Sequence, residues 1–307
     1  MRATAALHLA LCLVLLAGLA APSAQADATS GHAYEFLRLA AEPVGRALSG
    51  AHLASVEGPA SLAWNPAGLG ESAPSALLLS HAAWTAGTAW EWGALNLRHG
   101  SGAFGVGCGV LRSGSLEGYD RDGRSTGDFT PQQAYATLGY GRALSAAVSA
   151  GLMVEGILAG DGIEPADRSW ALGGGVLVHL GRADLALAAL HWAPALERDG
   201  ESYPLPGTVR AGGSVALPGH TRLHAAAEYL AGAGASGRFG AEWRATDAVA
   251  ALGGATLATV GGTAELQPTA GLAIDLGRVR FAYAYQPDTE IEAVHQLALT
   301  ALLGASR

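Results

Sequence analysis

The chain has 307 residues, of which half are hydrophobic and only 14% are charged, and it contains 44 glycines. Its 18 basic residues are all arginine and are outnumbered by 26 acidic residues, so the composition does not support the basic face of a nucleic-acid-binding protein. Only two cysteines occur, Cys12 and Cys108. Cys12 lies in an apolar N-terminal stretch, so removal of that stretch leaves no intramolecular disulfide.

Residues 1–26 have the features of a secretory signal peptide. Arg2 supplies a positive start, the stretch from Leu7 to Leu19 is apolar, and Ala24-Gln25-Ala26 fits the small-x-small cleavage rule. We therefore predict cleavage before Asp27. The alternative is a transmembrane anchor, which is less favoured because the apolar stretch is short and small residues follow it.

Residues 27–74 differ from the rest of the chain. An apolar patch contains Tyr34, Phe36, Leu37 and Leu39. Asn65-Pro66 is typical of a helix start, with Asn as the N-cap and Pro in the first helical position. The segment is too short to be an independent domain, so we expect it to lie inside or beneath the following structure as a plug.

Residues 75–307 alternate with period 2, which predicts β-strands with two different faces. In residues 104–110, for example, Phe and Val alternate with Gly. No apolar stretch after residue 26 reaches the about 18 residues that a membrane-spanning helix needs. The alternation predicts about 14 strands. We place them at 75–84, 89–98, 102–112, 131–142, 146–158, 168–180, 183–191, 206–217, 221–230, 237–245, 248–256, 266–276, 279–286 and 293–303.

A soluble β-sandwich and a membrane barrel can both give this alternation, and the connections separate them. Short connections near 99–101, 143–145, 181–182, 218–220, 246–247 and 277–278 alternate with longer ones at 113–130, 159–167, 192–205 and 257–265. This is typical of outer-membrane barrels. The predicted fold is an all-β, antiparallel transmembrane barrel of about 14 strands with a short N-terminal helical plug. We also expect an aromatic girdle at the long-loop end, made of Trp84, Trp90, Trp170, Trp192, Tyr229 and Tyr285.

A set of polar residues falls on the face that we assign to the lumen. It contains Arg98, Glu155, His179, Arg210, Arg222, His224, Glu228, Glu242, Arg244, Asp275 and Arg280. One interpretation is a selective pore. The other, which the mixture of signs favours, is a paired network that holds the plug and stiffens the wall. If Gly277 and Arg278 are the central residues of a tight turn, Asp275 faces Arg280 across the ladder.

The sequence contains no motif that predicts an enzyme, a cofactor or a metal site. Residues 232–237 match G-x-G-x-x-G, but a strand-like pattern follows where a dinucleotide site needs a helix, so we interpret them as a hairpin loop. There is no H-E-x-x-H motif, no Cys/His cluster and no G-x-S-x-G elbow. A hydrolase site built from Ser, His and acidic residues of separate strands would leave no such motif, and nothing in the sequence supports one.

Several segments resemble the PorV/PorQ family. They are Tyr34-Glu35-Phe36-Leu37-Arg38-Leu39, Gly45-Arg46-Ala47 with Gly50-Ala51, Trp64-Asn65-Pro66-Ala67-Gly68-Leu69, Leu205-Pro206 with Val209-Arg210-Ala211-Gly212, Phe239-Gly240-Ala241-Glu242-Trp243, and Gly271-Leu272 with Phe281-Ala282-Tyr283-Ala284-Tyr285. The resemblance covers nearly the whole chain after residue 26. Its most specific part is the Asn-Pro-Ala-Gly-Leu motif, although FadL-like proteins contain similar motifs.

The resemblance implies a FadL-like 14-stranded barrel in the outer membrane of a Gram-negative-type bacterium. It also implies a role in type IX secretion, where PorV binds C-terminal signals of exported proteins, so the expected partners are outer-membrane lipid, secreted cargo and other secretion components. The chain departs from the pattern because it lacks a terminal aromatic residue and has modest outer loops. A FadL-like channel for hydrophobic small molecules is the alternative. An open porin is less favoured, because residues 27–74 would obstruct it.

Overall fold

The computed structural model describes residues 32–71, 74–84, 87–160, 166–198, 200–260, 263–287 and 293–304. The predicted signal peptide and its cleavage site lie outside these residues. Among the residues that the structure describes, no helix is long and apolar enough to span a membrane.

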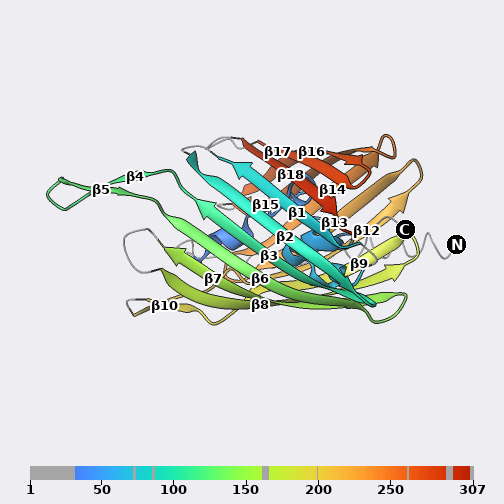
Figure 1. The fold of residues 1–307 in the computed structure, drawn as a ribbon, viewed down its shortest axis with the longest axis horizontal. Helices are drawn as coiled ribbons and strands as arrows, with labels where there is room; N and C mark the ends of the chain where they lie inside the picture. Colours follow the sequence, from blue (N-terminus) through green and yellow to red (C-terminus); the bar gives the residue numbers. More distant parts are fainter. Residues whose placement is uncertain are drawn as a thin grey trace.

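Fourteen antiparallel strands close into a barrel in which β1 pairs with both β2 and β18 (Figure 1). The barrel strands are β1 (Ala76–Ala83), β2 (Ala89–His99), β3 (Gly102–Arg112), β6 (Gln132–Ala143), β7 (Val148–Gly160), β8 (Asp167–Leu180), β9 (Ala183–Trp192), β12 (Thr208–Leu217), β13 (Thr221–Leu230), β14 (Gly234–Arg244), β15 (Val249–Val260), β16 (Thr263–Leu276), β17 (Val279–Gln286) and β18 (Val294–Leu302). The predicted all-β, antiparallel barrel of about 14 strands is confirmed.

The connections differ from the prediction in three places. The long connections after β3 and β9 contain two small hairpins, β4 (Leu116–Tyr119) with β5 (Ser125–Phe129), and β10 (Leu196–Arg198) with β11 (Glu201–Tyr203). Figure 1 shows β4–β5 projecting beyond the barrel at the long-loop end. The prediction of a long loop at 257–265 is wrong, because β15 and β16 extend into these residues.

The two faces of the wall carry different residues, as the alternation predicted. Large apolar side chains such as Leu172 and Val176 are 49% and 40% exposed on the outside. Four of the six aromatic residues expected in the girdle, Trp170, Trp192, Tyr229 and Tyr285, are also exposed. Trp90 corrects the prediction, because it is fully buried against Phe36 and Tyr135. Trp84 packs on the same inner cluster.

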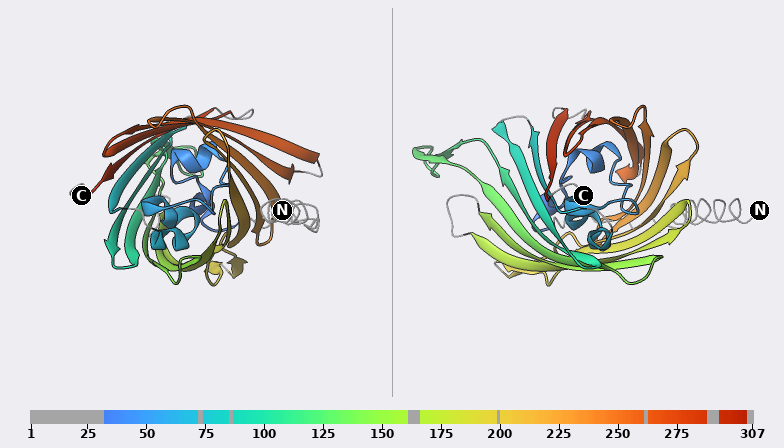
Figure 2. Two further views of the ribbon diagram at one scale, coloured as in Figure 1. Left: turned by 90° about the vertical axis from the view of Figure 1, so that its right-hand side faces the viewer. Right: turned by 45° about the vertical axis from the view of Figure 1, so that its right-hand side comes forward.

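The segment before β1 lies inside the barrel, as both views in Figure 2 show. We call residues 32–71 the plug. Its elements are short: η1 (Glu35–Arg38), α2 (Pro43–Ala47), η2 (Gly58–Ala60), α3 (Ser61–Trp64) and η3 (Pro66–Gly70). The helix start predicted at Asn65-Pro66 is confirmed as the start of η3, and the Asn65 side chain accepts a hydrogen bond from the Ala67 backbone.

Bare glycines on the inner wall let η3 approach the strands closely. A Cβ at Gly151 of β7 would lie 2.2 Å from the carbonyl oxygen of Pro66, and one at Gly175 of β8 would lie 2.1 Å from Asn65 Oδ1. Neither position tolerates a side chain without moving the plug. Asn65 also donates to the backbone of Leu53 and, at 3.4 Å, to that of Val176. The Asn-Pro-Ala-Gly-Leu motif therefore packs against the inward-facing glycines of these strands.

Candidate functional site

The outer half of the lumen is filled by an aromatic cluster. Plug residues Tyr34 and Phe36 meet Trp90, Trp92 and Tyr135 of the wall, with ring centroids 6.0–6.5 Å apart for the pairs in contact. Trp92 Nε1 donates to the Tyr135 hydroxyl at 2.8 Å. All five side chains are at most 8% exposed. This packing closes the lumen on the long-loop side with an almost entirely apolar surface.

A buried polar pair lies in the wall beside this cluster. Glu155 of β7 and His191 of β9 are 2% and 5% exposed, and His191 Nδ1 lies 2.7 Å from a Glu155 carboxylate oxygen. His191 has a φ of 60°, in the left-handed region that non-glycine residues seldom adopt. It lies where the β8–β9 register shifts between Leu172 and Gly174. The bulge therefore turns this imidazole toward a partner that regular pairing would not provide.

The short-turn half of the lumen is open. A cavity of about 710 Å³ lies between the plug and the turns at Gly181-Arg182 and Gly277-Arg278. Its apolar lining includes Val44 and Leu48 of the plug and small residues of the wall. Its charged lining includes His179, Asp184, Arg222, Arg244, Asp275 and Arg280, which pair among themselves, in contrast to the aromatic packing of the outer half.

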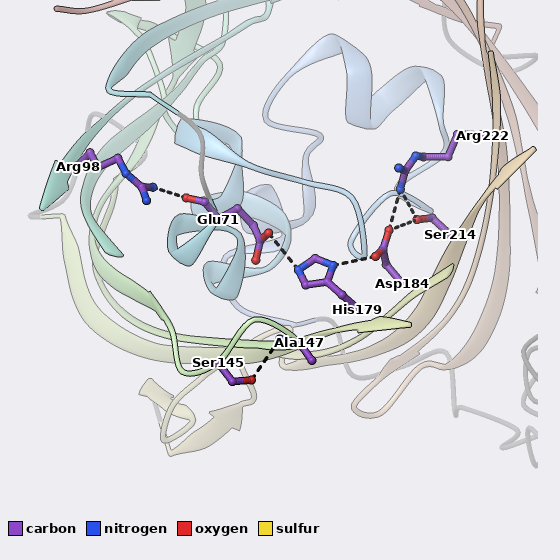
Figure 3. Close-up of polar contacts among 8 residues, drawn as sticks. All are labelled: Glu71, Arg98, Ser145, Ala147, His179, Asp184, Ser214 and Arg222. Atoms are coloured by element: carbon purple, nitrogen blue, oxygen red, sulfur yellow. Dashed lines mark hydrogen bonds and ion pairs between the residues drawn. The ribbon is translucent and has the colours of Figure 1, made fainter. Parts of the chain in front are cut away.

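One of these charged groups joins the end of the plug to the wall (Figure 3). His179 Nε2 lies 3.1 Å from a Glu71 carboxylate oxygen, and His179 Nδ1 lies 2.8 Å from Asp184. Arg222 donates to Asp184 at 2.8 Å, while Arg98 donates to the Glu71 carbonyl oxygen. A neutral imidazole has one N–H, so two carboxylate acceptors are satisfied together only by the protonated ring. These hydrogen bonds and ion pairs attach the last residue of the plug to the wall.

A second group lies on β14, β16 and β17. Asp275 faces Arg280 across the ladder, and the two side chains form a bidentate pair at 2.5 and 2.9 Å. The predicted cross-strand pair is confirmed. Arg244 lies 3.0 Å from Glu242 and 3.4 Å from Asp275, so four of the predicted lumen residues form one cluster at the cavity.

A third group is buried between the plug and β12–β14. Arg210 is paired with Glu228, which also accepts from Arg238 at 2.5 Å. Arg238 donates to the Ser49 carbonyl oxygen at 2.9 Å, and the Arg210 guanidinium lies 5.3 Å from the centre of the Trp64 ring. The predicted wall residues Arg210 and Glu228 therefore meet the plug in the middle of the barrel.

Arg46 fixes α2 on the opposite side of the plug. Its side chain donates to Gln296 at 2.6 Å and to Gln286 at 2.9 Å, and its guanidinium lies 5.6 Å from the Trp84 ring centre. Gln296 in turn donates to the Ala40 carbonyl oxygen at 3.0 Å. These neutral amides bind a plug arginine without adding a charge to the wall.

Two buried titratable residues, Glu42 and His52, lie inside the plug. Glu42 caps α2 by accepting from Val44 and Gly45, and it also accepts from Trp64 Nε1 at 3.1 Å. Burial raises the pKa of Glu42, while these hydrogen bonds act in the opposite direction. Burial, with smaller contributions from His224 and Arg210, lowers the pKa of His52 to about 3. His52 is therefore neutral where the plug is packed.

The remaining residues of the predicted family motif lie within the plug core. Leu37, Ala47, Pro66, Ala67, Gly68 and Leu69 are buried, and Gly50 has a φ of 74° beside Arg238. A Cβ at Gly45 would lie 2.2 Å from the Trp64 ring, and one at Gly68 would lie 2.3 Å from the Val56 carbonyl oxygen. The motif therefore specifies close packing of the plug.

The sequence interpretation missed several residues that contact the plug. Arg238 could have been found by extending the period-2 face of Glu242 and Arg244 by two steps toward the start of β14. Glu42 precedes a proline, as Asn65 does, and has the same capping role. Gln296 gives no comparable signal, because its partners lie 250 and 256 residues away in the chain. Among the residues described, no three His, Cys, Asp or Glu side chains are grouped as a metal site.

Comparison with known proteins identifies the fold. No family model matches the sequence, and no curated protein matches it. Among solved structures, the CymD monoaromatic hydrocarbon channel has a TM-score of 0.62 and 13% identity, covering 87% of this chain and 98% of CymD. A Pseudomonas aeruginosa FadL homologue has a TM-score of 0.58 and 10% identity, covering 86% and 98%. The Pseudomonas putida toluene transporter TodX has a TM-score of 0.57 and 11% identity, covering 86% and 99%. The chain therefore has the fold of FadL-type outer-membrane channels.

Proposed function

We propose that this protein is an outer-membrane channel for hydrophobic small molecules. The observation that carries the proposal is a closed 14-stranded barrel around an internal plug, in the fold that CymD and TodX share. At this level of sequence identity the likeness concerns the fold, so the solute class rests on the lining of the lumen as well. That lining supports an apolar solute, because the outer half presents buried aromatic rings.

The two halves of the lumen give a physical account of passage. An apolar molecule can replace protein contacts within the aromatic cluster of Phe36, Trp90 and Tyr135 at little desolvation cost. It has no such partners in the cavity beyond the plug, where paired charges dominate. Passage therefore requires rearrangement of the aromatic cluster and the plug, followed by weak retention at the short-turn side.

Uptake of a hydrophobic probe tests this function directly. Cells that lack their own FadL-type channels would be given the full-length protein, and entry of labelled toluene would be compared with entry of a small hydrophilic sugar. We expect faster toluene entry and unchanged sugar entry, since the plug obstructs the lumen. Trp243→Ala changes only an exposed side chain on the outward face of β14. It serves as a control for expression of a folded barrel whose lumen is unchanged. A folded barrel that leaves toluene entry at the level of empty cells would contradict the proposal.

Placement in a membrane is tested separately at the outward face. Val176 is 40% exposed near the middle of β8, so Val176→Arg should cost about 2–4 kcal/mol of folding free energy at the bilayer midplane. Denaturant titration of the barrel folded in liposomes measures this, with Val176→Ala as the smaller control. An equal stability of both variants would show that Val176 does not face acyl chains.

The secretion role suggested by the PorV/PorQ resemblance stays a prediction. The compared structures are channels, and the described outer loops hold only two small hairpins with which to bind cargo. Affinity purification from the native outer membrane would identify cargo or secretion components if that prediction holds. The hydrophobic-channel function is favoured because it uses the lumen described above.

A further inference from the structure

The outward face of the wall carries a polar cluster beside the seam where β1 meets β18. Among the barrel strands described, Glu91 of β2 is the one carboxylate on the outward face, and it lies 2.7 Å from His81 Nδ1 of β1. Both side chains are about half exposed, at 51% for His81 and 46% for Glu91. A carboxylate is costly on a surface that faces acyl chains, so the position of Glu91 indicates a polar partner there.

A second polar pair lies on the neighbouring strands. The Tyr283 hydroxyl and His295 Nδ1 form a hydrogen bond of 2.8 Å on the outward face of β17 and β18. The ladder register places Leu297 between Tyr283 and His81, and it places His295 opposite Ala83. His81 and His295 are therefore diagonal neighbours on adjacent strands, within about 7–8 Å of each other.

These contacts leave three polar atoms for a ligand. Within the part of the chain that the structure describes, Nε2 of His81, Nε2 of His295 and the second carboxylate oxygen of Glu91 have no hydrogen-bond partner. In the tautomer whose Nδ1 accepts from the Tyr283 hydroxyl, His295 carries its proton on Nε2. A protonated His81 has a second N–H at Nε2, which together with the Nε2–H of His295 suits phosphate oxygens, and a carboxylate oxygen suits hydroxyl donors.

An apolar groove adjoins the polar cluster. It has a volume of about 420 Å³, within the usual range of ~300–1,000 Å³ for small-molecule sites. His81, Glu91 and Tyr283 lie along one side, and the apolar lining is formed by Leu79, Leu272, Ile274, Phe281, Leu297 and Leu299. Small inward-facing residues, Ala282 and Ala298, form part of its floor. The groove thus combines a polar end with a surface for an alkyl chain.

We propose that this surface binds a phosphorylated glycolipid of the outer leaflet. Its phosphate accepts hydrogen bonds from the Nε2–H groups of protonated His81 and of His295, a sugar hydroxyl donates to Glu91, and one acyl chain lies in the groove. The level of the cluster supports this occupant, because His81 is two residues from the long-loop end of β1 and so lies at headgroup depth. The inference rests on the outer-membrane placement proposed above, but not on the transported solute.

Native mass spectrometry of the full-length protein in detergent tests the proposal. The protein would be titrated with lipid A, with dephosphorylated lipid A and with an ethanolamine phospholipid. We expect lipid A to be retained about tenfold more strongly than either comparison, the factor that ~1.4 kcal/mol represents. Equal retention of the three lipids would overturn the proposal, as would a barrel dimer that occupies the groove in place of lipid.

Variants assign the binding to the cluster. His81→Ala with His295→Ala should remove the preference for lipid A, and Leu297→Trp should weaken retention of every lipid by filling the groove. His99→Ala is the matched control, since His99 is an exposed outward histidine at the opposite end of β2. Unchanged selectivity in the double variant would overturn the assignment. Toluene entry should stay normal in these variants, which separates failure of this inference from failure of the channel function.

Discussion

The two halves of the lumen differ in packing and in polarity. On the long-loop side, plug and wall share a close-packed aromatic cluster around Trp90, and its polar atoms are few. On the short-turn side, plug and wall enclose a cavity of about 710 Å³, and charged pairs such as Asp275–Arg280 line it. Strand β2 contributes to both halves, because its inward face carries Trp90 and Trp92 toward the long-loop end and Arg98 near the short-turn end.

This difference separates stability from plug retention. Apolar burial contributes most of the favourable free energy of packing, so the aromatic half should dominate the stability of the closed state. Partly solvated ion pairs contribute little individually, but they define where the plug ends and which strands it meets. The following changes should therefore have effects that decrease from the outer half to the cavity.

The largest effect is expected for Trp90→Ala. Trp90 is fully buried, so its truncation should cost about 3–5 kcal/mol and open a void against Phe36 and Tyr135. Denaturant unfolding in liposomes would measure the loss, with the exposed Trp243→Ala as the control. If both tryptophan variants lost the same amount, the aromatic cluster would not be the main packing of the lumen.

An intermediate effect is expected from the pH dependence of the plug. The pKa of His52 is lowered to about 3 in the folded chain, against about 6.5 in an unfolded one. Between these values the unfolded state binds the extra proton, so stability falls as pH decreases through this window. At pH 5 the contribution lost is about 2 kcal/mol. His52→Gln should flatten the stability profile between pH 7 and 5, and an unchanged slope would show that His52 is solvated.

The smallest effect is expected at the cavity. Asp275 and Arg280 are partly exposed, so a double-mutant cycle should give a coupling free energy of about 1 kcal/mol. Arg280→Ala and Asp275→Ala, alone and together, would be compared by unfolding in liposomes. A coupling as large as the Trp90 effect would mean that this pair is shielded from solvent, and the contrast between the two halves would not hold.

The wall could be predicted from sequence because strand periodicity is local. The two-residue turn at Gly277-Arg278 determines the register of β16 and β17, and so it also determines the pairing of Asp275 with Arg280. The Asn65-Pro66 signal is equally local, since the cap and the proline are adjacent. These features need no knowledge of distant parts of the chain.

The contents of the lumen could not be predicted in the same way. Trp90 is near a strand end, where an aromatic residue suits either a girdle or the interior, and only its contact with Phe36 of the plug decides between them. Partnerships such as Arg46 with Gln296 join residues 250 positions apart, with no periodic signal in either segment. Plug contacts depend on how the plug is oriented, and the alternation of the wall does not specify that orientation.

The seam between β1 and β18 has a consequence for how the barrel is assembled. It pairs Ala76 with Leu302, so the wall closes only after nearly the whole chain is available. Such distant pairing is slow to form, because a long loop must close first. The plug is attached directly ahead of β1 and can therefore dock on the glycines of β7 and β8 while the wall is still an open sheet. Closure of the seam would then enclose a plug that is already in place, and no finished wall has to be crossed.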